Sequence, residues 1–286
     1  MNGAHLSSAT SMPVVKHVLR ARGADGGWSP VAAVCELAGQ TVFVPAEFPC
    51  GECGACRRSF VSSCVARVRW LGDDLFPKIP IGNRFAYGFD PAVIPERHAL
   101  WAAIVIPWLE AMGRTGLGPG DVSFWLGESP LVLLGACLAN SRGSQVIVSG
   151  PSDLGETMAA LFIGEEGSIP TFTPLHLLDE KALAAQNKAA SGFIERQIFT
   201  QGEDSMLWSA AGTLLGPGCT LVVFGPLPAL AGLPADARIF TLGFDANPDF
   251  AAEALAALSR DSTLNRICLG LVAAGAFDIS PNEVLA

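Results

Sequence analysis

The sequence predicts an α/β protein in which a small N-terminal β domain with a cysteine-rich lobe precedes a doubly wound parallel sheet. Three observations lead to this prediction. Short apolar stretches separated by glycines fill the first part of the chain, and four closely spaced cysteines interrupt them. From about residue 98 onward, apolar stretches of strand length and of helix length alternate. Since such alternation produces parallel sheets with right-handed crossovers, the second part should be a nucleotide-binding type of domain.

The composition is that of a globular protein with a large core. The chain has 286 residues, of which 50% are hydrophobic, enough for two domains. The net charge is −9 and Lys and Arg total only 18, so nucleic acid is not an expected partner. No apolar stretch is long enough to span a membrane, and the N-terminus lacks the pattern of a secretory signal. With cysteines placed for metal rather than for pairing, these features predict a cytoplasmic protein.

The N-terminal β domain is expected to cover residues 13–98, after a disordered stretch over residues 1–12. Its strands are predicted from short β-prone stretches bounded by turn residues, and the last two should close the domain. The predicted strands are Pro13–Leu19, Val31–Cys35, Thr41–Val44, Phe85–Tyr87 and Ala92–Pro95.

A lobe over residues 48–70 interrupts these strands and holds a C-x2-C-x2-C-x7-C pattern. Its cysteines are Cys50, Cys53, Cys56 and Cys64. Thiolates two residues apart on a tight turn can converge on one ion while a short excursion returns the fourth. Four thiolates close the coordination sphere of zinc, so one structural zinc per chain is predicted. Two alternatives stay open at this point: an iron–sulfur cluster, and cysteines that are unlinked or paired in disulfides.

The second domain is expected to cover residues 99–286. Its predicted strands are Val122–Leu126, Gln145–Ser149, Glu195–Phe199, Thr220–Phe224 and Arg238–Phe244. Its predicted helices are Leu100–Met112, Leu131–Asn140, Leu154–Gly164, Asp204–Leu215 and Phe250–Leu258. The late strand is apolar on both faces, which suits either an interface or an interior strand covered by the helix that follows it.

The cysteine pattern, with Val42–Ala46 before it, resembles the structural-zinc lobe of the medium-chain, zinc-containing alcohol dehydrogenase family. Within that family it looks most like the dehydrogenases that act on cyclic hydroxyacyl-CoA thioesters. Support comes also from Leu117–Asp121, Leu214–Gly218 and Leu221–Gly225. The resemblance implies a truncated GroES-like β domain, a Rossmann-type sheet and an NAD(P)-dependent oxidoreductase whose catalytic metal lies in the β domain.

The resemblance also implies a dinucleotide site at the turn after the first strand of the second domain. Of the expected glycine fingerprint only Gly127 remains, while Glu128 adds negative charge and Pro130 removes a backbone donor. Ser149 stands where an acidic residue would bind the ribose. Gly127 and Ser149 are thus the candidate cofactor-binding residues, and nicotinamide dinucleotides are expected to bind weakly or not at all.

No catalytic residue is predicted. A catalytic zinc needs a thiolate or carboxylate, a histidine, an acidic neighbour and one open position. His17 is interpreted as a structural histidine, and Cys35 as a buried core residue. The stretch Ala102–Pro107, where the family pattern would place another polar site residue, offers only side chains that cannot bind a cation.

These features favour a catalytically degenerate protein that keeps the fold and the zinc lobe and serves as a subunit or scaffold of a dehydrogenase-type assembly. The alternative is an active NAD(P)-dependent medium-chain dehydrogenase that oxidises an alcohol or a hydroxyacyl-CoA thioester. The expected partner is a second copy or a related dehydrogenase. In the family that Arg238–Phe244 resembles, the corresponding strand pairs with its two-fold mate.

Overall fold

The computed structural model describes most of the chain and divides it into two units. The described residues are 12–23, 25–57, 64, 66–71, 85–128, 130–162, 170–175, 197–201, 205–214, 218–224, 235–242 and 247–281. The first unit combines Met1–Pro107 with Phe244–Ala286, and the second is Trp108–Gly243. This division differs from the boundary expected near residue 98, because the C-terminal segment belongs to the first unit.

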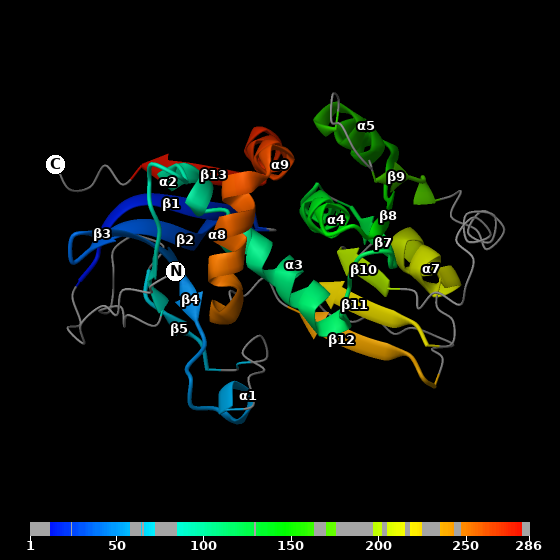
Figure 1. Cartoon of the computed structure of the whole chain (residues 1–286), viewed down its shortest axis with the longest axis horizontal. Helices are drawn as coiled ribbons and strands as arrows, with labels where there is room; N and C mark the ends of the chain where they lie inside the picture. The colour runs from blue at the N-terminus through cyan, green and yellow to red at the C-terminus, as the bar shows by residue number, and fades with distance from the viewer. Residues whose placement is uncertain are drawn as a thin grey trace. The chain divides into compact units, whose positions relative to one another are not determined.

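The first unit contains a five-stranded antiparallel sheet in the order β13-β1-β2-β3-β6 (Figure 1). Its strands are β1 (Val14–Arg22), β2 (Trp28–Leu37), β3 (Gln40–Pro45), β6 (Tyr87–Gly88) and β13 (Phe277–Pro281). Ala38 and Gly39 both have positive φ angles, +50° and +78°, which is the geometry of a tight hairpin turn between β2 and β3. One core of this unit is formed by residues of β1, β2 and β3 together with Phe48, Trp70 and Phe85.

The edge strands of this sheet are β13 and β6, and β6 overlaps the strand predicted at Phe85–Tyr87. The prediction of a strand at Ala92–Pro95 was wrong. Those residues form a turn, because the Asp90 side chain accepts the backbone N–H of Ala92 at 2.9 Å and its carbonyl accepts that of Val93. The turn leads into the short helix α2 (Glu96–Ala99). β13 pairs with β1, placing Phe277 opposite Ala21.

Two helices precede β13, namely α8 (Ala251–Arg260) and α9 (Ser262–Ala273), with a 3-10 turn, η4, at Pro248–Phe250. The helix predicted at Phe250–Leu258 is confirmed as α8, whereas α9 was not predicted. Asp261 starts α9 by accepting the backbone N–H of Leu264 at 2.9 Å.

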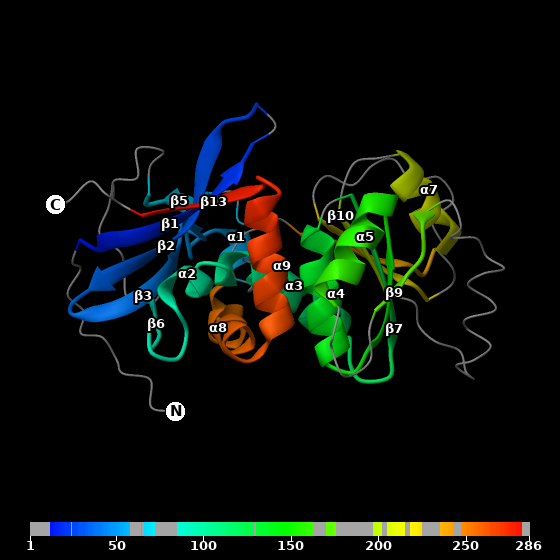
Figure 2. The same cartoon turned by 90° about the horizontal axis from the view of Figure 1, so that it is seen from above.

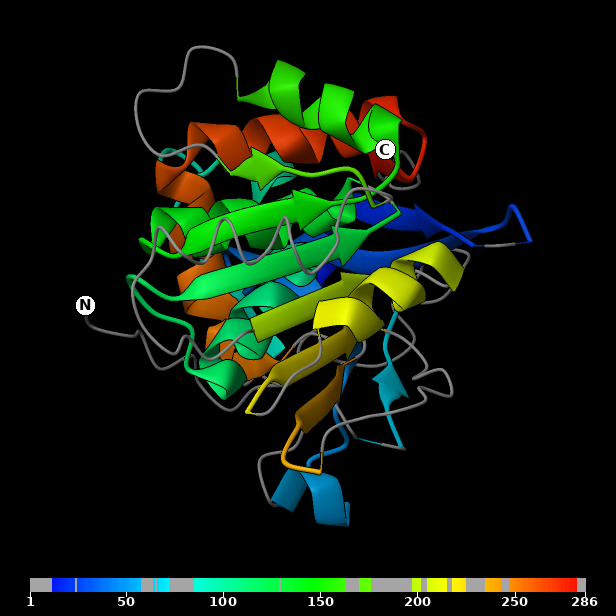
Figure 3. The same cartoon turned by 90° about the vertical axis from the view of Figure 1, so that its right-hand side faces the viewer.

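The second unit is built on a six-stranded parallel sheet in the order β12-β11-β10-β7-β8-β9, and Figure 3 shows these strands side by side, pointing the same way. The strands are β7 (Val122–Gly127), β8 (Gln145–Ser149), β9 (Thr171–Phe172), β10 (Gln197–Gln201), β11 (Thr220–Phe224) and β12 (Arg238–Leu242). The helices are α4 (Leu131–Ser141), α5 (Ser152–Leu161) and α7 (Ser205–Leu214), while α3 (Ala102–Thr115) contains the unit boundary at Pro107. The predicted parallel sheet is therefore confirmed. The predicted ends Gly164, Glu195, Asp204, Leu215 and Phe244 lie outside the described residues.

The two faces of the parallel sheet pack against different helices, and α4 and α7 lie on opposite sides of it (Figure 2). Phe124 and Ile198 belong to the core on the α7 side. Their strand neighbours Trp125 and Phe199 stack on the other face with ring centroids 4.1 Å apart. Alternation along the strands thus places Trp125 and Phe199 together on the face opposite α7, which we call the aromatic face.

Replacing Gly135 of α4 with alanine is expected to destabilise the protein by about 1–3 kcal/mol, since overpacking a filled core costs that much. A Cβ at this position would lie 2.1 Å from the Trp125 ring and 2.7 Å from the Trp108 ring. Urea unfolding followed by tryptophan fluorescence measures the change. Gly212→Ala in α7 is the matched control, because nothing lies within 4 Å of its Cβ position. Equal stabilities for the two variants would contradict this account of the aromatic face.

Candidate metal centre

The cysteine lobe stands on a small two-stranded base attached to the core of the first unit. In this base β4 (Glu47–Phe48) pairs with β5 (Val68–Arg69), and the Arg69 side chain donates to Glu47 at 2.9 Å. The Phe48 ring stacks on Phe85 with centroids 4.1 Å apart. The lobe is therefore anchored on both sides, which fixes where the chain leaves the sheet and where it returns.

The structure brings the four predicted ligands together between these anchors. Their sulfur atoms all lie within 4.8 Å of one another. Gly51 allows the turn with a φ of +78°, and the short helix α1 (Gly54–Arg57) carries Cys56 back toward Cys53. Backbone N–H groups support the arrangement: that of Cys53 donates to the Cys50 sulfur, and that of Cys50 to the Cys64 sulfur, each at 3.3 Å.

The sulfur separations fit a single tetrahedral ion. Four of the six pairs are 3.5–3.9 Å apart. A zinc ion with bonds of about 2.3 Å would set them about 3.8 Å apart. The separations are too long for disulfides, and all eight cysteines are free. They are also too short to enclose an iron–sulfur cluster, whose thiolates bind different irons. The donor set fits zinc, and zinc occupancy stays a prediction.

The surroundings of the sulfurs give Cys53 and Cys56 different pKa values. Backbone N–H donation from Cys56 is the largest cause that holds the pKa of Cys53 at about 6. Burial raises the pKa of Cys56 to about 12. Because a metal binds cysteines as thiolates, its affinity for these four sulfurs should fall as the solution becomes acidic.

The two candidate cofactor-binding residues also lie close together, since Leu126, next to Gly127, is paired with Ser149 in the parallel sheet. Their surroundings do not fit a dinucleotide. Ser149 is fully buried, and its hydroxyl donates to the backbone carbonyl of Thr173 at 2.6 Å. A Cβ on Gly127 would lie 2.7 Å from the Cβ of Val132, so that side chain fills the space beside the turn.

The N-terminus of α4 also has few groups that could bind a pyrophosphate. The residue before the helix is Pro130, which has no N–H, and no side chain caps this end. Glu128 is exposed at the turn and carries the same charge sign as a phosphate. A Cβ on Gly150 would lie 2.5 Å from the carbonyl oxygen of Gly127, so the two turns are packed directly together. Ser129 lies outside the described residues.

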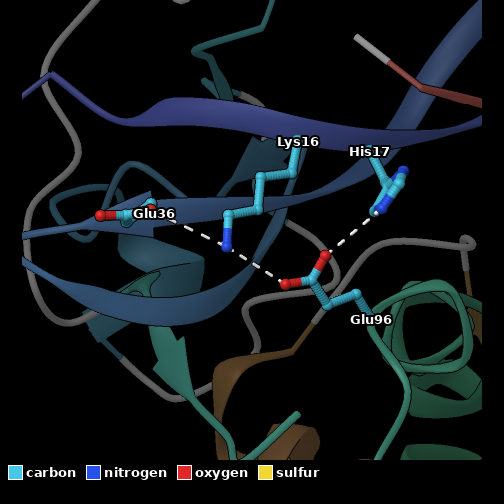
Figure 4. Close-up of polar contacts among 4 residues, drawn as sticks. All are labelled: Lys16, His17, Glu36 and Glu96. Atoms are coloured by element: carbon cyan, nitrogen blue, oxygen red, sulfur yellow. Dashed lines mark hydrogen bonds and ion pairs between the residues drawn. The ribbon is translucent and has the colours of Figure 1, made fainter.

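The other residues considered as metal ligands are engaged elsewhere. His17 Nε2 lies 3.3 Å from one carboxylate oxygen of Glu96, and Lys16 Nζ lies 3.2 Å from the other. Figure 4 shows both side chains pointing toward Glu96. The side chains of Lys16 and His17 are consecutive in β1. A β-bulge between Val15 and His17 brings both of them toward α2. The sequence offered no signal for this contact. Burial raises the pKa of the Cys35 thiol to about 12. Within the described ranges, the lobe cysteines are the one group of three or more potential ligands close enough to share an ion.

Comparison with known proteins gives the class to which this fold corresponds. No family model matches the chain. The alcohol dehydrogenase TADH from Thermus sp. ATN1 is 15% identical, with a TM-score of 0.69 over 99% of this chain and 95% of that one. The zinc-dependent alcohol dehydrogenase 2 from Streptococcus pneumonia is 14% identical, with a TM-score of 0.68 over 100% and 95%. The fold, with its antiparallel and parallel sheets, is thus similar to the fold of zinc-dependent alcohol dehydrogenases.

Individual relatives come from the polyol and sugar-acid dehydrogenases as well. A sorbitol dehydrogenase from Halalkalibacterium halodurans is 30% identical over 107 residues, which is 36% of this chain and 31% of that protein. L-idonate 5-dehydrogenase from Escherichia coli is 14% identical, with a TM-score of 0.66 over 94% of this chain and 91% of that one. The chain thus matches about a third of the length of its curated relative. No helix within the described segments has the length and apolarity needed to cross a membrane.

Proposed function

We propose that this chain is a catalytically degenerate member of a dehydrogenase-type assembly, in which it serves as a subunit or scaffold whose lobe is held by one structural zinc. The observation that carries the proposal is the packing at the turn after β7. Val132 fills the space beside Gly127, and the Ser149 hydroxyl is bonded within the sheet. Hydride transfer to or from a nicotinamide needs a cofactor held at this edge of the sheet. The eight free cysteines support a reducing, cytoplasmic location.

The alternative is an active NAD(P)-dependent dehydrogenase that oxidises an alcohol or a hydroxyacyl-CoA thioester. The names of the similar structures favour it. They include a putative zinc-binding dehydrogenase from Sinorhizobium meliloti 1021 bound to NADP, which is 14% identical with a TM-score of 0.61. For this alternative the turn after β7 would have to open and supply donors to the phosphates.

The affinity of the chain for nicotinamide cofactors distinguishes the two proposed functions. We expect no quenching of tryptophan fluorescence by NADH or NADPH up to millimolar concentration, because each unpaired phosphate oxygen costs about 1–3 kcal/mol. The paired variant Glu128→Ala with Pro130→Gly should strengthen any residual binding by restoring a donor and removing the negative charge. Adding Val132→Gly should strengthen it further by opening the space beside Gly127. A micromolar dissociation constant for the natural chain, measured by calorimetry, would establish the alternative.

A further inference from the structure

Three of the eight cysteines are accessible to solvent. Cys50, Cys53 and Cys56 are partly exposed, whereas the fourth lobe cysteine, Cys64, is buried with an exposure of 7%. The other four lie in the cores of the two units, with exposures of 0% for Cys35, 4% for Cys137 and 1% each for Cys219 and Cys268. Since oxidation of a thiol requires contact with the oxidant, any oxidation of the folded protein should concentrate on the lobe.

Within the lobe the sulfurs are arranged as two couples. The Cys53 and Cys56 sulfurs are 3.5 Å apart, and those of Cys50 and Cys64 are 3.6 Å apart. Of the four pairs that cross between the couples, Cys50 with Cys56 and Cys53 with Cys64 are each 3.9 Å apart, and the other two lie within 4.8 Å. Closing the Cys53–Cys56 pair from 3.5 Å to a disulfide length of roughly 2.05 Å is an approach of about 1.5 Å. These two residues are also a C-x-x-C pair, a spacing that forms disulfides readily.

We propose that the lobe is a site of reversible oxidation, in which a peroxide joins Cys53 to Cys56 first and Cys50 to Cys64 second, and thereby releases the metal. The inference rests on the zinc occupancy of the proposed function. It adds a modification of these residues that is separate from any role in catalysis or assembly.

The chemistry of each step balances with hydrogen peroxide as the oxidant. One thiolate attacks the peroxide, which forms a sulfenic acid and releases hydroxide. The neighbouring thiolate then attacks that sulfur, the S–S bond forms and a second hydroxide leaves. Two protons convert the hydroxides to water, so one peroxide oxidises one pair by two electrons. A zinc ion held by the four thiolates would keep its oxidation state, lose two of its four donors and pass to solvent or to a chelator.

The experiment uses the full chain, whose zinc content is measured before any oxidant is added. Hydrogen peroxide is then titrated in the presence of a colorimetric zinc chelator, and the cysteine pairs are identified by peptide mass spectrometry. We expect one zinc released per chain, a Cys53–Cys56 linkage that appears before Cys50–Cys64, and four cysteines outside the lobe that stay reduced. Dithiothreitol with added zinc should restore the starting metal content.

Two variants sharpen the test. Glu52→Ala, an exposed change within the same segment, should release zinc with the same stoichiometry as the natural chain. Cys53→Ser, reloaded with zinc in excess, should form no Cys53–Cys56 linkage and should lose the fixed order of pairing. Zinc retained after peroxide, a first linkage between members of different couples, or oxidation at the four cysteines outside the lobe would each overturn the proposal. A chain without zinc at the outset would refute the metal site instead, while the mapped pairs would still test the oxidation order.

Discussion

Replacing Cys56 with serine is expected to remove the metal from the lobe and to leave the second unit folded. The Cys56 sulfur lies 3.5 Å from that of Cys53 and 3.9 Å from that of Cys50, so it completes the tetrahedron. A hydroxyl is not a soft donor, and with three thiolates left the zinc affinity should fall at least about 100-fold. Binding of structural zinc contributes about 10–16 kcal/mol in small metal-dependent domains, and this energy folds the lobe.

Metal analysis measures the loss of zinc, and limited proteolysis shows which part of the chain has unfolded. The variant should contain no zinc and should be cleaved within residues 48–70. The stacked Trp125 and Phe199 of the second unit should keep their native fluorescence and near-ultraviolet circular dichroism. Glu52→Ala is the matched control, since Glu52 lies between two ligands and supplies none of the four sulfurs. Two zinc ions per natural chain would contradict the single site and would restore the case for a catalytic metal.

The lobe could be predicted from the sequence because its geometry is local. Cys50, Cys53 and Cys56 lie within seven consecutive residues, and a turn at Gly51 is enough to converge their side chains. The strands and helices of the second unit were predictable for a similar reason, except for the two-residue strand β9, which was not predicted. Each is a single apolar stretch with its own turn residues, and β7, α4 and β8 were all placed within two residues of their observed bounds.

The remaining features depend on residues far apart in the sequence. β13 is too polar to be recognised alone, and it becomes a strand by pairing with β1 at Arg20, whose side chain contacts Asp278. The contact of His17 with Glu96 likewise depends on a bulge in β1 that leaves no mark in the sequence. The missing glycines predicted a poor dinucleotide site. The sequence could not predict that Val132 fills the space beside Gly127, because that contact depends on how α4 packs against the turn after β7.

Position in the sheet now favours one of the two interpretations of the late apolar strand. Over the described residues, β12 stands at the end of the sheet order and pairs on one side with β11. The backbone N–H of Arg238 donates to Cys219, which precedes β11. Because hydrogen bonding alternates along a parallel strand, the N–H of Thr241 points away from β11. An outward-facing edge of this kind can pair with a second copy by two-fold symmetry.

Thr241→Pro is therefore expected to abolish self-association while leaving the bonds between β12 and β11 in place. Proline removes the outward donor and places its ring at the edge, where it blocks an approaching strand. Light scattering should show a dimer or a larger species for the natural chain, and an increase of at least about 100-fold in the dissociation constant for the variant, because several edge hydrogen bonds are lost together. Thr241→Ala, which keeps the N–H, should behave like the natural chain. A monomeric natural chain at micromolar concentration, with no related dehydrogenase recovered alongside it from its host, would reject assembly through β12.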